Sequence, residues 1–287
     1  MYPLIFNFFP TYGLFGLLAG FAAIWIMRRE LVLAGFDKEK YTDLLIILII
    51  SGLAGARALF VIIDYQRFFS SVSAMKKIFY LHDGGYVFFG GLLTGLIILF
   101  YLRKKIRLLP LLDIMALALP FAHIFGRMGC FMAGCCYGKP TDLPLGMRFG
   151  KESAAFGEMA VNLQVNPAFH THTPPLYPTQ LFEVFANLLV FVFLYLFKKN
   201  KKYHGQMAAF YLLLYGFFRF VIEIFRGDNS RGFVFRTTWP QLADFLHFPV
   251  DSPVFLSTSA FISLLMMVSA SVFLIYKSHT VKISENK

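Results

Sequence analysis

Charged residues are scarce in this chain of 287 residues: they make up 15% of it, against 57% hydrophobic residues. Such a composition is too apolar for a soluble domain of this length. Acidic residues are the scarcer kind, with 16 Asp and Glu against 27 Lys and Arg, which gives a formal net charge of +11. A basic balance can indicate nucleic-acid binding. Here the basic residues stand in short clusters between apolar runs, which is instead typical of a membrane protein.

Cysteine is also rare. The three cysteines, Cys130, Cys135 and Cys136, lie so close together in the sequence that they cannot form a disulfide framework. The first residues, MYPLIFNFFPTYG, lack the basic region and the small-residue cleavage site of a secretory signal peptide. We therefore expect the first apolar run to remain as a helix. The sequence shows neither an internal repeat nor a low-complexity tract.

Apolar segments long enough to cross a bilayer as helices are abundant. Because lipid offers no partner to unpaired backbone groups, the sequence predicts an all-α, polytopic integral membrane protein. We expect a single membrane domain over residues 1–287 with seven transmembrane helices. The predicted spans centre on residues 11–27, 43–63, 86–102, 111–128, 180–197, 206–225 and 255–276.

The basic residues predict the orientation of these spans. Cytoplasmic loops carry an excess of Lys and Arg. The N-terminus is therefore predicted outside and the C-terminus in the cytoplasm, with outward-facing loops at about 129–179 and 226–254. More than half of the basic residues follow the first, third and fifth spans or lie in the tail: Arg28, Arg29, Lys38, Lys40, Arg103, Lys104, Lys105, Arg107, Lys198, Lys199, Lys201, Lys202, Lys277, Lys282 and Lys287.

Three arginines, Arg57, Arg127 and Arg219, fall inside predicted spans, where a charge is costly. Each lies toward the outer end of its span, so snorkelling to the headgroup layer is one interpretation. For Arg57 this interpretation and a functional one are equally favoured, and Arg226 at a span boundary also fits snorkelling. Glu223 follows Arg219 by one helical turn, which indicates either an internal ion pair or a carboxylate that orients the guanidinium toward a ligand.

Arg127 lacks an acidic partner nearby in the sequence and is flanked by Gly126 and Gly129. An unpaired guanidinium inside a membrane protein predicts an anionic ligand, and its fork of donors suits a phosphate. The abundant phosphate in an outward-leaning membrane cavity is a phospholipid headgroup. Arg127 and Arg219, on different helices, are predicted to clamp one phosphodiester, with the glycines allowing the backbone to approach it.

Further glycines and polar residues lie at the predicted span ends. Gly84 with Gly85, and Gly90 with Gly91, indicate either close helix packing or a backbone that bends toward a ligand. In YPTQLFE, Thr179 and Gln180 open the fifth span. A helix N-terminus there favours anion binding. Plain capping at the water interface explains these two residues equally well.

The cysteine spacing C-x4-CC is not a usual zinc spacing, and no histidine follows at a position that would complete a site. A thiol nucleophile would need a general base, and only His123 is near in the sequence. We therefore expect no metal site, and packing of small buried residues under a loop is the favoured interpretation.

Eight sequence blocks, taken in order, resemble the bacterial prolipoprotein diacylglyceryl transferases, and together they cover nearly the whole chain. That family consists of seven-span membrane enzymes with an outer N-terminus and a cytoplasmic C-terminus. The blocks are TYGL (11–14), RRELVLAG (28–35), GARALF (55–60), DGGYVFFGGLLTG (83–95), GRMGCFMAGCCYG (126–138), YPTQLFE (177–183), FRFVIEIFR (218–226) and LSTSAFIS (256–263).

The resemblance implies a reaction in the bacterial cytoplasmic (inner) membrane. The diacylglyceryl group of phosphatidylglycerol moves to the lipobox cysteine thiol of a prolipoprotein, and glycerol 1-phosphate leaves, without a metal or other cofactor. Arg127 and Arg219 match the family's two key arginines and are expected to be catalytic. With them, the predicted lipid-binding residues are Tyr12, Arg57, Gly126, Gly129, Thr179, Gln180, Glu223 and Arg226.

The chain departs from the family pattern where proton acceptors are expected. The proton of the incoming thiol would then pass to His123, Tyr177 or Glu183, or to water. The alternative function is that of a paralogue that binds or transports phospholipid without transferase activity. Five residues differ from the family pattern. Phe89 and Tyr177 stand where the family has histidines, Cys130 where it has asparagine, Cys135 where it has glutamate and Ala260 where it has glutamine.

Overall fold

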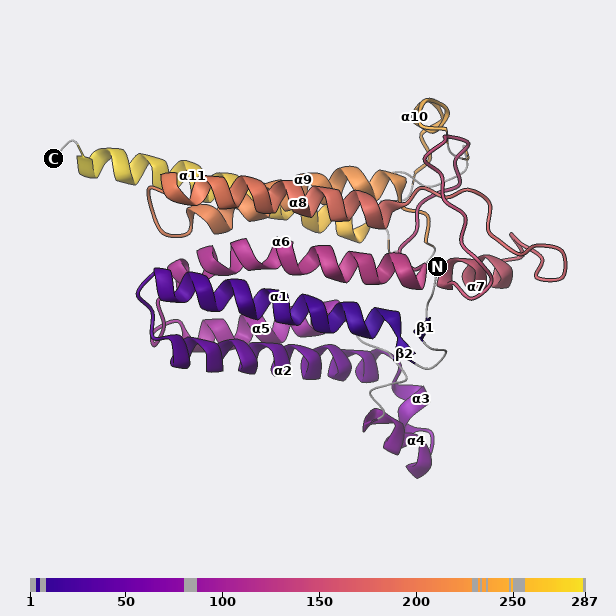
Figure 1. Cartoon of the computed structure of the whole chain (residues 1–287), viewed down its shortest axis with the longest axis horizontal. Coiled ribbons are helices and arrows are strands. Elements are labelled where there is room, and N and C mark those ends of the chain that lie inside the picture. Colours follow the sequence, from indigo (N-terminus) through magenta and orange to yellow (C-terminus); the bar gives the residue numbers. More distant parts are fainter. Residues whose placement is uncertain are drawn as a thin grey trace. The chain divides into compact units, whose positions relative to one another are not determined.

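The structure is a computed structural model of the chain and is predominantly helical. It describes residues 4–5, 9–79, 87–228, 232, 234–235, 237–247, 249 and 256–285, so Gly84 and Gly85 lie outside the described residues. The longer helices are α1 (Thr11–Leu33), α2 (Lys38–Ile63), α5 (Phe88–Leu102), α6 (Leu108–Ala133), α8 (Thr179–Phe197), α9 (Gln206–Phe225) and α11 (Thr258–Glu285) (Figure 1). The shorter helical elements are α3 (Tyr65–Phe69), α4 (Val72–Lys76), η1 (Lys77–Phe79), α7 (Ala154–Val161), η3 (Lys198–Asn200) and α10 (Pro240–Phe245).

The described strands are short. β1 (Leu4–Ile5) and β2 (Phe9–Pro10) pair antiparallel before the first helix, with Leu4 opposite Pro10.

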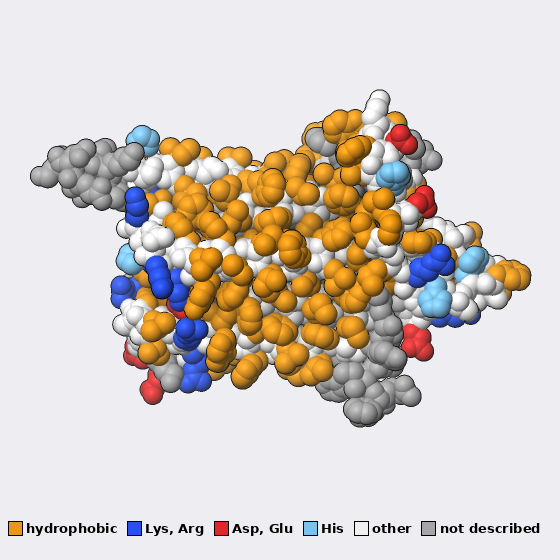
Figure 2. All heavy atoms as spheres, turned by 45° about the horizontal axis from the view of Figure 1, so that its top comes forward, with side chains coloured by type: hydrophobic (Ala, Val, Ile, Leu, Met, Phe, Trp, Pro, Cys, Tyr) orange, Lys and Arg blue, Asp and Glu red, His pale blue; other side chains and the backbone are white. Residues whose placement is uncertain are grey.

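Six helices, α1, α2, α6, α8, α9 and α11, are long and apolar enough to cross a membrane, and they coincide with six of the predicted spans. The third predicted span coincides with α5, an apolar helix whose 15 residues fall short of the roughly 20 that span a bilayer. Hydrophobic side chains cover the helices on the face shown in Figure 2, and large ones such as Phe21 are mostly exposed. Such a surface suits lipid, and the chain is a multi-pass membrane protein.

The chain divides into two compact units, one formed by residues 28–111 and the other by residues 1–27 with 112–287. In the first unit, α2 and α5 pack through glycines. A β-carbon at Gly91 would lie 2.7 Å from the carbonyl oxygen of Gly52, and one at Gly55 would lie 2.7 Å from that of Gly90. The helix-packing interpretation of Gly90 and Gly91 is therefore confirmed.

In the second unit, α8 packs against α9 and α9 packs against α11 (Figure 1). The N-terminus of α9 is capped from another helix, because the carboxylate of Asp113 on α6 accepts hydrogen bonds from the backbone N–H groups of Gly205 (2.7 Å) and Ala208 (3.0 Å). Asp113 is buried, and Lys201 lies 3.4 Å from the same carboxylate. This contact satisfies donors that a helix start leaves unpaired.

Helix α6 is longer than predicted. It runs through Gly126 and Gly129 to Ala133, and the chain turns only at Gly134, whose φ is +69°. The backbone therefore does not bend at Arg127. A span in lipid keeps its internal hydrogen bonds. Gly129 serves contact instead, because a β-carbon there would lie 2.9 Å from Cβ of Phe15 on α1.

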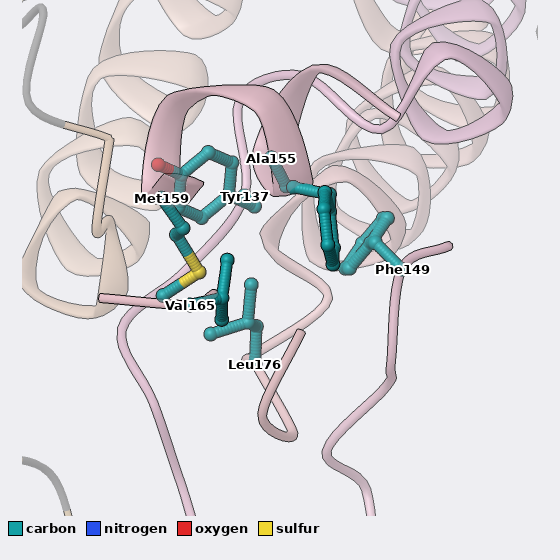
Figure 3. Close-up of a cluster of buried hydrophobic side chains, with 7 residues drawn as sticks. Tyr137, Phe149, Ala155, Met159, Val165 and Leu176 are labelled. Atoms are coloured by element: carbon teal, nitrogen blue, oxygen red, sulfur yellow. The ribbon is translucent and has the colours of Figure 1, made fainter. Parts of the chain in front are cut away.

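The connection from α6 to α8, residues 134–178, was predicted as a loop but has a hydrophobic core of its own. Figure 3 shows its side chains gathered around α7 and pointing toward one another. Backbone hydrogen bonds close the segment on itself and tie it to the end of α9. Gly138 N–H donates to the carbonyl of Tyr177, at the other end of the segment (2.9 Å), and Lys139 N–H donates to the Phe225 carbonyl of α9 (2.8 Å). The buried members of the core are Tyr137, Phe149, Ala155, Phe156, Met159, Val165 and Leu176.

Candidate functional site

Glu183, on the second turn of α8, is the centre of a buried network of charges. Its Oε2 lies 2.8 Å from Nε of Arg127 on α6, and its Oε1 lies 2.9 Å from Nη1 of Arg219 on α9. A third guanidinium, that of Arg226, approaches Oε1 at 3.7 Å. One carboxylate on α8 thus draws together an arginine of α6 and two arginines at the end of α9, which are far apart from it in the sequence.

Two more carboxylates complete the network. Arg219 Nη2 lies 2.7 Å from Glu223 Oε2, one turn along α9, so the predicted ion pair at this spacing is confirmed. Arg226 donates two hydrogen bonds of 2.7 Å, from Nε and Nη2, to the two oxygens of Asp228. Burial opposes the charge of Arg226, but the bidentate contact with Asp228 raises the pKa of Arg226 above its usual value.

The network corrects one expectation, because Arg127 is not an unpaired guanidinium. Its partner lies on a different helix, where spacing along one helix cannot reveal it. Exposure differs within the network: the side chains of Arg127 and Arg219 are 15% and 12% exposed, whereas those of Arg226 and Glu183 are 6% and 3% exposed. Arg127 and Arg219 are therefore the more accessible arginines of this network.

The beginning of α1 lies beside Arg127. A β-carbon at Gly129, two residues after Arg127, would lie 3.4 Å from Cδ2 of Tyr12. The Tyr12 side chain is 55% exposed. A β-carbon at Gly126 would meet no other atom within 4 Å among the described residues, so there is open space on that side of α6.

Thr179 and Gln180 are fully buried and hold the turn that follows α6. Thr179 Oγ1 donates to the Cys136 carbonyl (2.7 Å), and Gln180 Nε2 donates to the Cys135 carbonyl (2.6 Å). Neither side chain caps α8, because Pro178 occupies the N-cap position and no side-chain cap is formed. The capping interpretation is therefore wrong, and contact of these two residues with lipid stays a prediction.

The candidate proton acceptors have different surroundings. Each carboxylate oxygen of Glu183 lies within ion-pair distance of a guanidinium group. Tyr177 is buried, and its hydroxyl donates to the carbonyl of Leu246, just after α10. The ring of His123, one turn before Arg127 on α6, stacks on the ring of Tyr215 at 5.5 Å between centroids.

Arg57 belongs to the unit of residues 28–111, where it ties α2 to η1. Its Nε donates to the Ile78 carbonyl (3.0 Å) and its Nη2 to the Lys77 carbonyl (2.8 Å), while its guanidinium lies over the rings of Phe60 and Phe68. These contacts explain how the buried charge is accommodated. A lipid contact by Arg57 stays a prediction.

Glu183 was predicted only as a proton acceptor, and Asp228 was not predicted to belong to the site. The signal for Glu183 was present, because an acidic residue inside a predicted span calls for a cationic partner as much as an arginine does. A very small pocket of about 10 Å³ adjoins this carboxylate and is lined on its polar side by Glu183, Asn187, Tyr215 and Arg219.

Comparison with known proteins agrees with the resemblance. The model of the prolipoprotein diacylglyceryl transferase family matches residues 3–276. The chain belongs to this family. Its relatives in the prolipoprotein diacylglyceryl transferase family include the phosphatidylglycerol–prolipoprotein diacylglyceryl transferase of Clostridium tetani, 28% identical over 274 residues, which cover 93% of this chain and 94% of the relative.

Two other members of the prolipoprotein diacylglyceryl transferase family carry closely similar names. The phosphatidylglycerol–prolipoprotein diacylglyceryl transferase 2 of Clostridium perfringens is 29% identical over 250 residues, 86% of this chain and 82% of the relative. The phosphatidylglycerol–prolipoprotein diacylglyceryl transferase of Wigglesworthia glossinidia brevipalpis is 31% identical over 232 residues, 77% of this chain and 80% of the relative.

Proposed function

We propose that this chain transfers the diacylglyceryl group of phosphatidylglycerol to the lipobox cysteine thiol of prolipoproteins and releases glycerol 1-phosphate. Family membership supports the reaction. The observation that carries the assignment of residues is the convergence of Arg127 and Arg219, from different helices, on Glu183, with both guanidinium groups partly exposed. Two guanidinium groups held close together match the oxygens of one phosphodiester.

The departing phosphate gains negative charge during the reaction, and the arginines stabilise that charge. The thiolate attacks the glyceryl carbon, a carbon–sulfur bond forms, and the carbon–oxygen bond to the phosphate breaks. The phosphodiester carries one negative charge, and the departing phosphate monoester gains a second. Arg127 pairs with Glu183 through Nε, which is one of five N–H donors on a guanidinium. Its other donors can contact phosphate oxygens while Nε stays on Glu183.

The contacts narrow the route of the thiol proton. The Tyr177 hydroxyl donates to a backbone carbonyl, so it is not placed to accept a proton. The carboxylate of Glu183 lies within ion-pair distance of Arg127 and Arg219, which favours its charged form and makes it a weak base. His123 and water remain. A free thiol has a pKa of about 8.5, so roughly a tenfold or greater bias against the thiolate at neutral pH does not prevent transfer from a water-exposed thiol.

The placement in the membrane is also part of this proposal. We place the chain in the bacterial cytoplasmic membrane as one membrane domain with seven spans, counting α5 as the third. The clusters of basic residues support an outer N-terminus, a cytoplasmic C-terminus and outward-facing segments at about 129–179 and 226–254. In this orientation Tyr12, Arg127, Arg219 and Arg226 all lie at the outward ends of their helices.

The test uses purified protein in phosphatidylglycerol vesicles with a synthetic peptide that carries a lipobox cysteine. We expect the peptide mass to rise by one diacylglyceryl group and glycerol phosphate to appear in equal amount. Arg127→Ala removes one half of the phosphate clamp and should abolish both signals. Arg148→Ala, at an exposed arginine of the 134–178 segment, is the matched control and should leave both unchanged.

Two outcomes would overturn this assignment. If the wild-type chain binds phosphatidylglycerol but never releases glycerol phosphate, the chain is the lipid-binding paralogue. If Arg127→Ala transfers at the wild-type rate, another group holds the phosphate and the proposed clamp is wrong.

A further inference from the structure

The three cysteines converge in space although their spacing is not that of a usual metal site. Cys130 lies on the last turn of α6, and Cys135 and Cys136 lie in the turn that follows. Their three Sγ atoms all lie within 4.8 Å of one another, and each residue is partly accessible. Among the residues that the structure describes, these cysteines form a group of three potential metal ligands.

The backbone holds this convergence in place. Two left-handed residues, Gly134 (φ +69°) and Cys136 (φ +58°), fold the chain back, and Cys135 N–H donates to the Cys130 carbonyl at 3.1 Å. The start of α8 fixes the other side, because the buried Thr179 and Gln180 side chains donate to the carbonyls of Cys136 and Cys135. A left-handed non-glycine residue is uncommon and points to a functional or strained turn.

We propose that Cys130, Cys135 and Cys136 form a three-thiolate site for a soft metal cation, Cu(I). Metal–sulfur distances of about 2.3 Å would place three sulfur atoms in a plane around the ion about 4 Å apart. The observed separations therefore need to shrink by less than about 1 Å. Thiolates select soft cations, and Cu(I) is satisfied by three ligands, whereas a structural zinc site takes four.

The charge of the loaded site would be balanced by its surroundings. Each thiol gives its proton to solvent as it becomes a ligand, so Cu(I) with three thiolates carries two negative charges. Arg127 precedes Cys130 by one turn of α6, and Arg226 pairs in a backbone bridge with Gly138, two residues after Cys136. Two guanidinium groups thus stand where an anionic metal–thiolate centre needs them.

A consequence for transfer follows, and it rests on the proposed function. Arg127 lies three residues before Cys130 on the same face of α6. A doubly negative centre beside Arg127 would compete with the phosphate of the lipid for that guanidinium. Loading with Cu(I) should therefore lower transferase activity at least tenfold, and a Cu(I) chelator should restore it.

Metal binding is measured on the whole reduced protein in detergent, without oxygen. We expect one Cu(I) per chain after desalting, and Cd²⁺ alone should give one thiolate-to-metal charge-transfer band in the ultraviolet. Cys130→Ser, Cys135→Ser and Cys136→Ser should each weaken the band by at least a third, because each removes one of the three thiolates of the chain. His170→Ala, at an exposed histidine of the 134–178 segment, is the control for adventitious binding and should keep it.

A second measurement avoids the serine variants, in case one of them fails to fold. Cu(I) should protect all three thiols of the wild-type protein from maleimide, counted by mass. Unprotected thiols, a band that keeps its full intensity in the cysteine variants, or one that disappears in His170→Ala would each overturn the site. Because binding is read by mass and absorbance, its failure is distinct from a lack of transferase activity. One Cu(I) bound with unchanged transfer would overturn only the inhibitory link.

Discussion

Replacement of Glu183 by glutamine is the sharpest test of the charge network. At an effective dielectric constant of about 20, the gross attraction is about 6 kcal/mol for the 2.8 Å contact with Arg127 and about 4.5 kcal/mol for the 3.7 Å contact with Arg226. The cost of burying these charges offsets much of that attraction. Breaking one buried pair typically costs about 3–5 kcal/mol, because the remaining charge is left uncompensated. In Glu183→Gln, three arginines would face only Glu223 and Asp228.

The assay has two parts, thermal unfolding in detergent and transfer to a lipobox peptide. We expect Glu183→Gln to lose about 3 kcal/mol or more of stability. We expect transfer to fall about 100-fold, because a misplacement of about 1 Å in a positioning group can have that effect. Glu152→Gln, at an exposed glutamate of the 134–178 segment, should change stability by less than about 0.5 kcal/mol.

Double-mutant cycles that combine Glu183→Gln with Arg127→Ala or with Arg226→Ala then separate the contributions of these two arginines. The shorter contact predicts a larger coupling of Glu183 with Arg127 than with Arg226, whose main partner is Asp228. If Glu183→Gln unfolds and transfers like the wild type, the network neither stabilises the fold nor positions the arginines. If coupling with Arg226 is the larger, the geometry assigned to Glu183 is wrong.

Two further predictions concern the fold. Asp113→Ala should lower stability by about 2 kcal/mol, measured as thermal unfolding in detergent, because the N–H groups of Gly205 and Ala208 lose their acceptor in a buried place. Gly90→Ala should lower it by about 1–3 kcal/mol, because a β-carbon at Gly90 would run into the backbone of Gly55 and force α2 and α5 apart.

Each of these has a matched control. Asp142→Ala changes an exposed aspartate of the 134–178 segment and should be neutral. Gly95→Ala lies on the same helix as Gly90, but its β-carbon would meet nothing within 4 Å, so it should not destabilise the protein. Equal effects of the two glycine substitutions would show that α2 and α5 do not depend on close approach, and unchanged unfolding of Asp113→Ala would remove its capping role.

The helices could be predicted because hydropathy over about 20 residues is a local property of the sequence. The end of α6 was harder. The predicted span ended at residue 128, but the helix continues through Gly129 to Ala133, and the chain turns where Gly134 and Cys136 take left-handed conformations. Such backbone angles at a cysteine follow from its surroundings and not from its own preference.

Local sequence patterns could not predict the ion pairs between different helices. Spacing along one helix revealed the partner of Arg219 in Glu223, four residues away. Arg127 and Glu183 lie on different helices, and only packing brings them together. The same limit applies to the cysteines, whose spacing argued against a shared site until the turn placed their sulfur atoms side by side.

The departures from the family pattern are easier to understand once the contacts are known. Tyr177 stands where the resemblance places a histidine, yet its ring packs on Phe225 and Phe182 and its hydroxyl is bound to the Leu246 carbonyl. A side chain held in this way has a structural role at this position, and its hydroxyl is already used in a hydrogen bond. Arg127 and Arg219 remain in a network with Glu183. The proposed chemistry of this member therefore relies on charge stabilisation of the leaving phosphate by these arginines more than on a dedicated base.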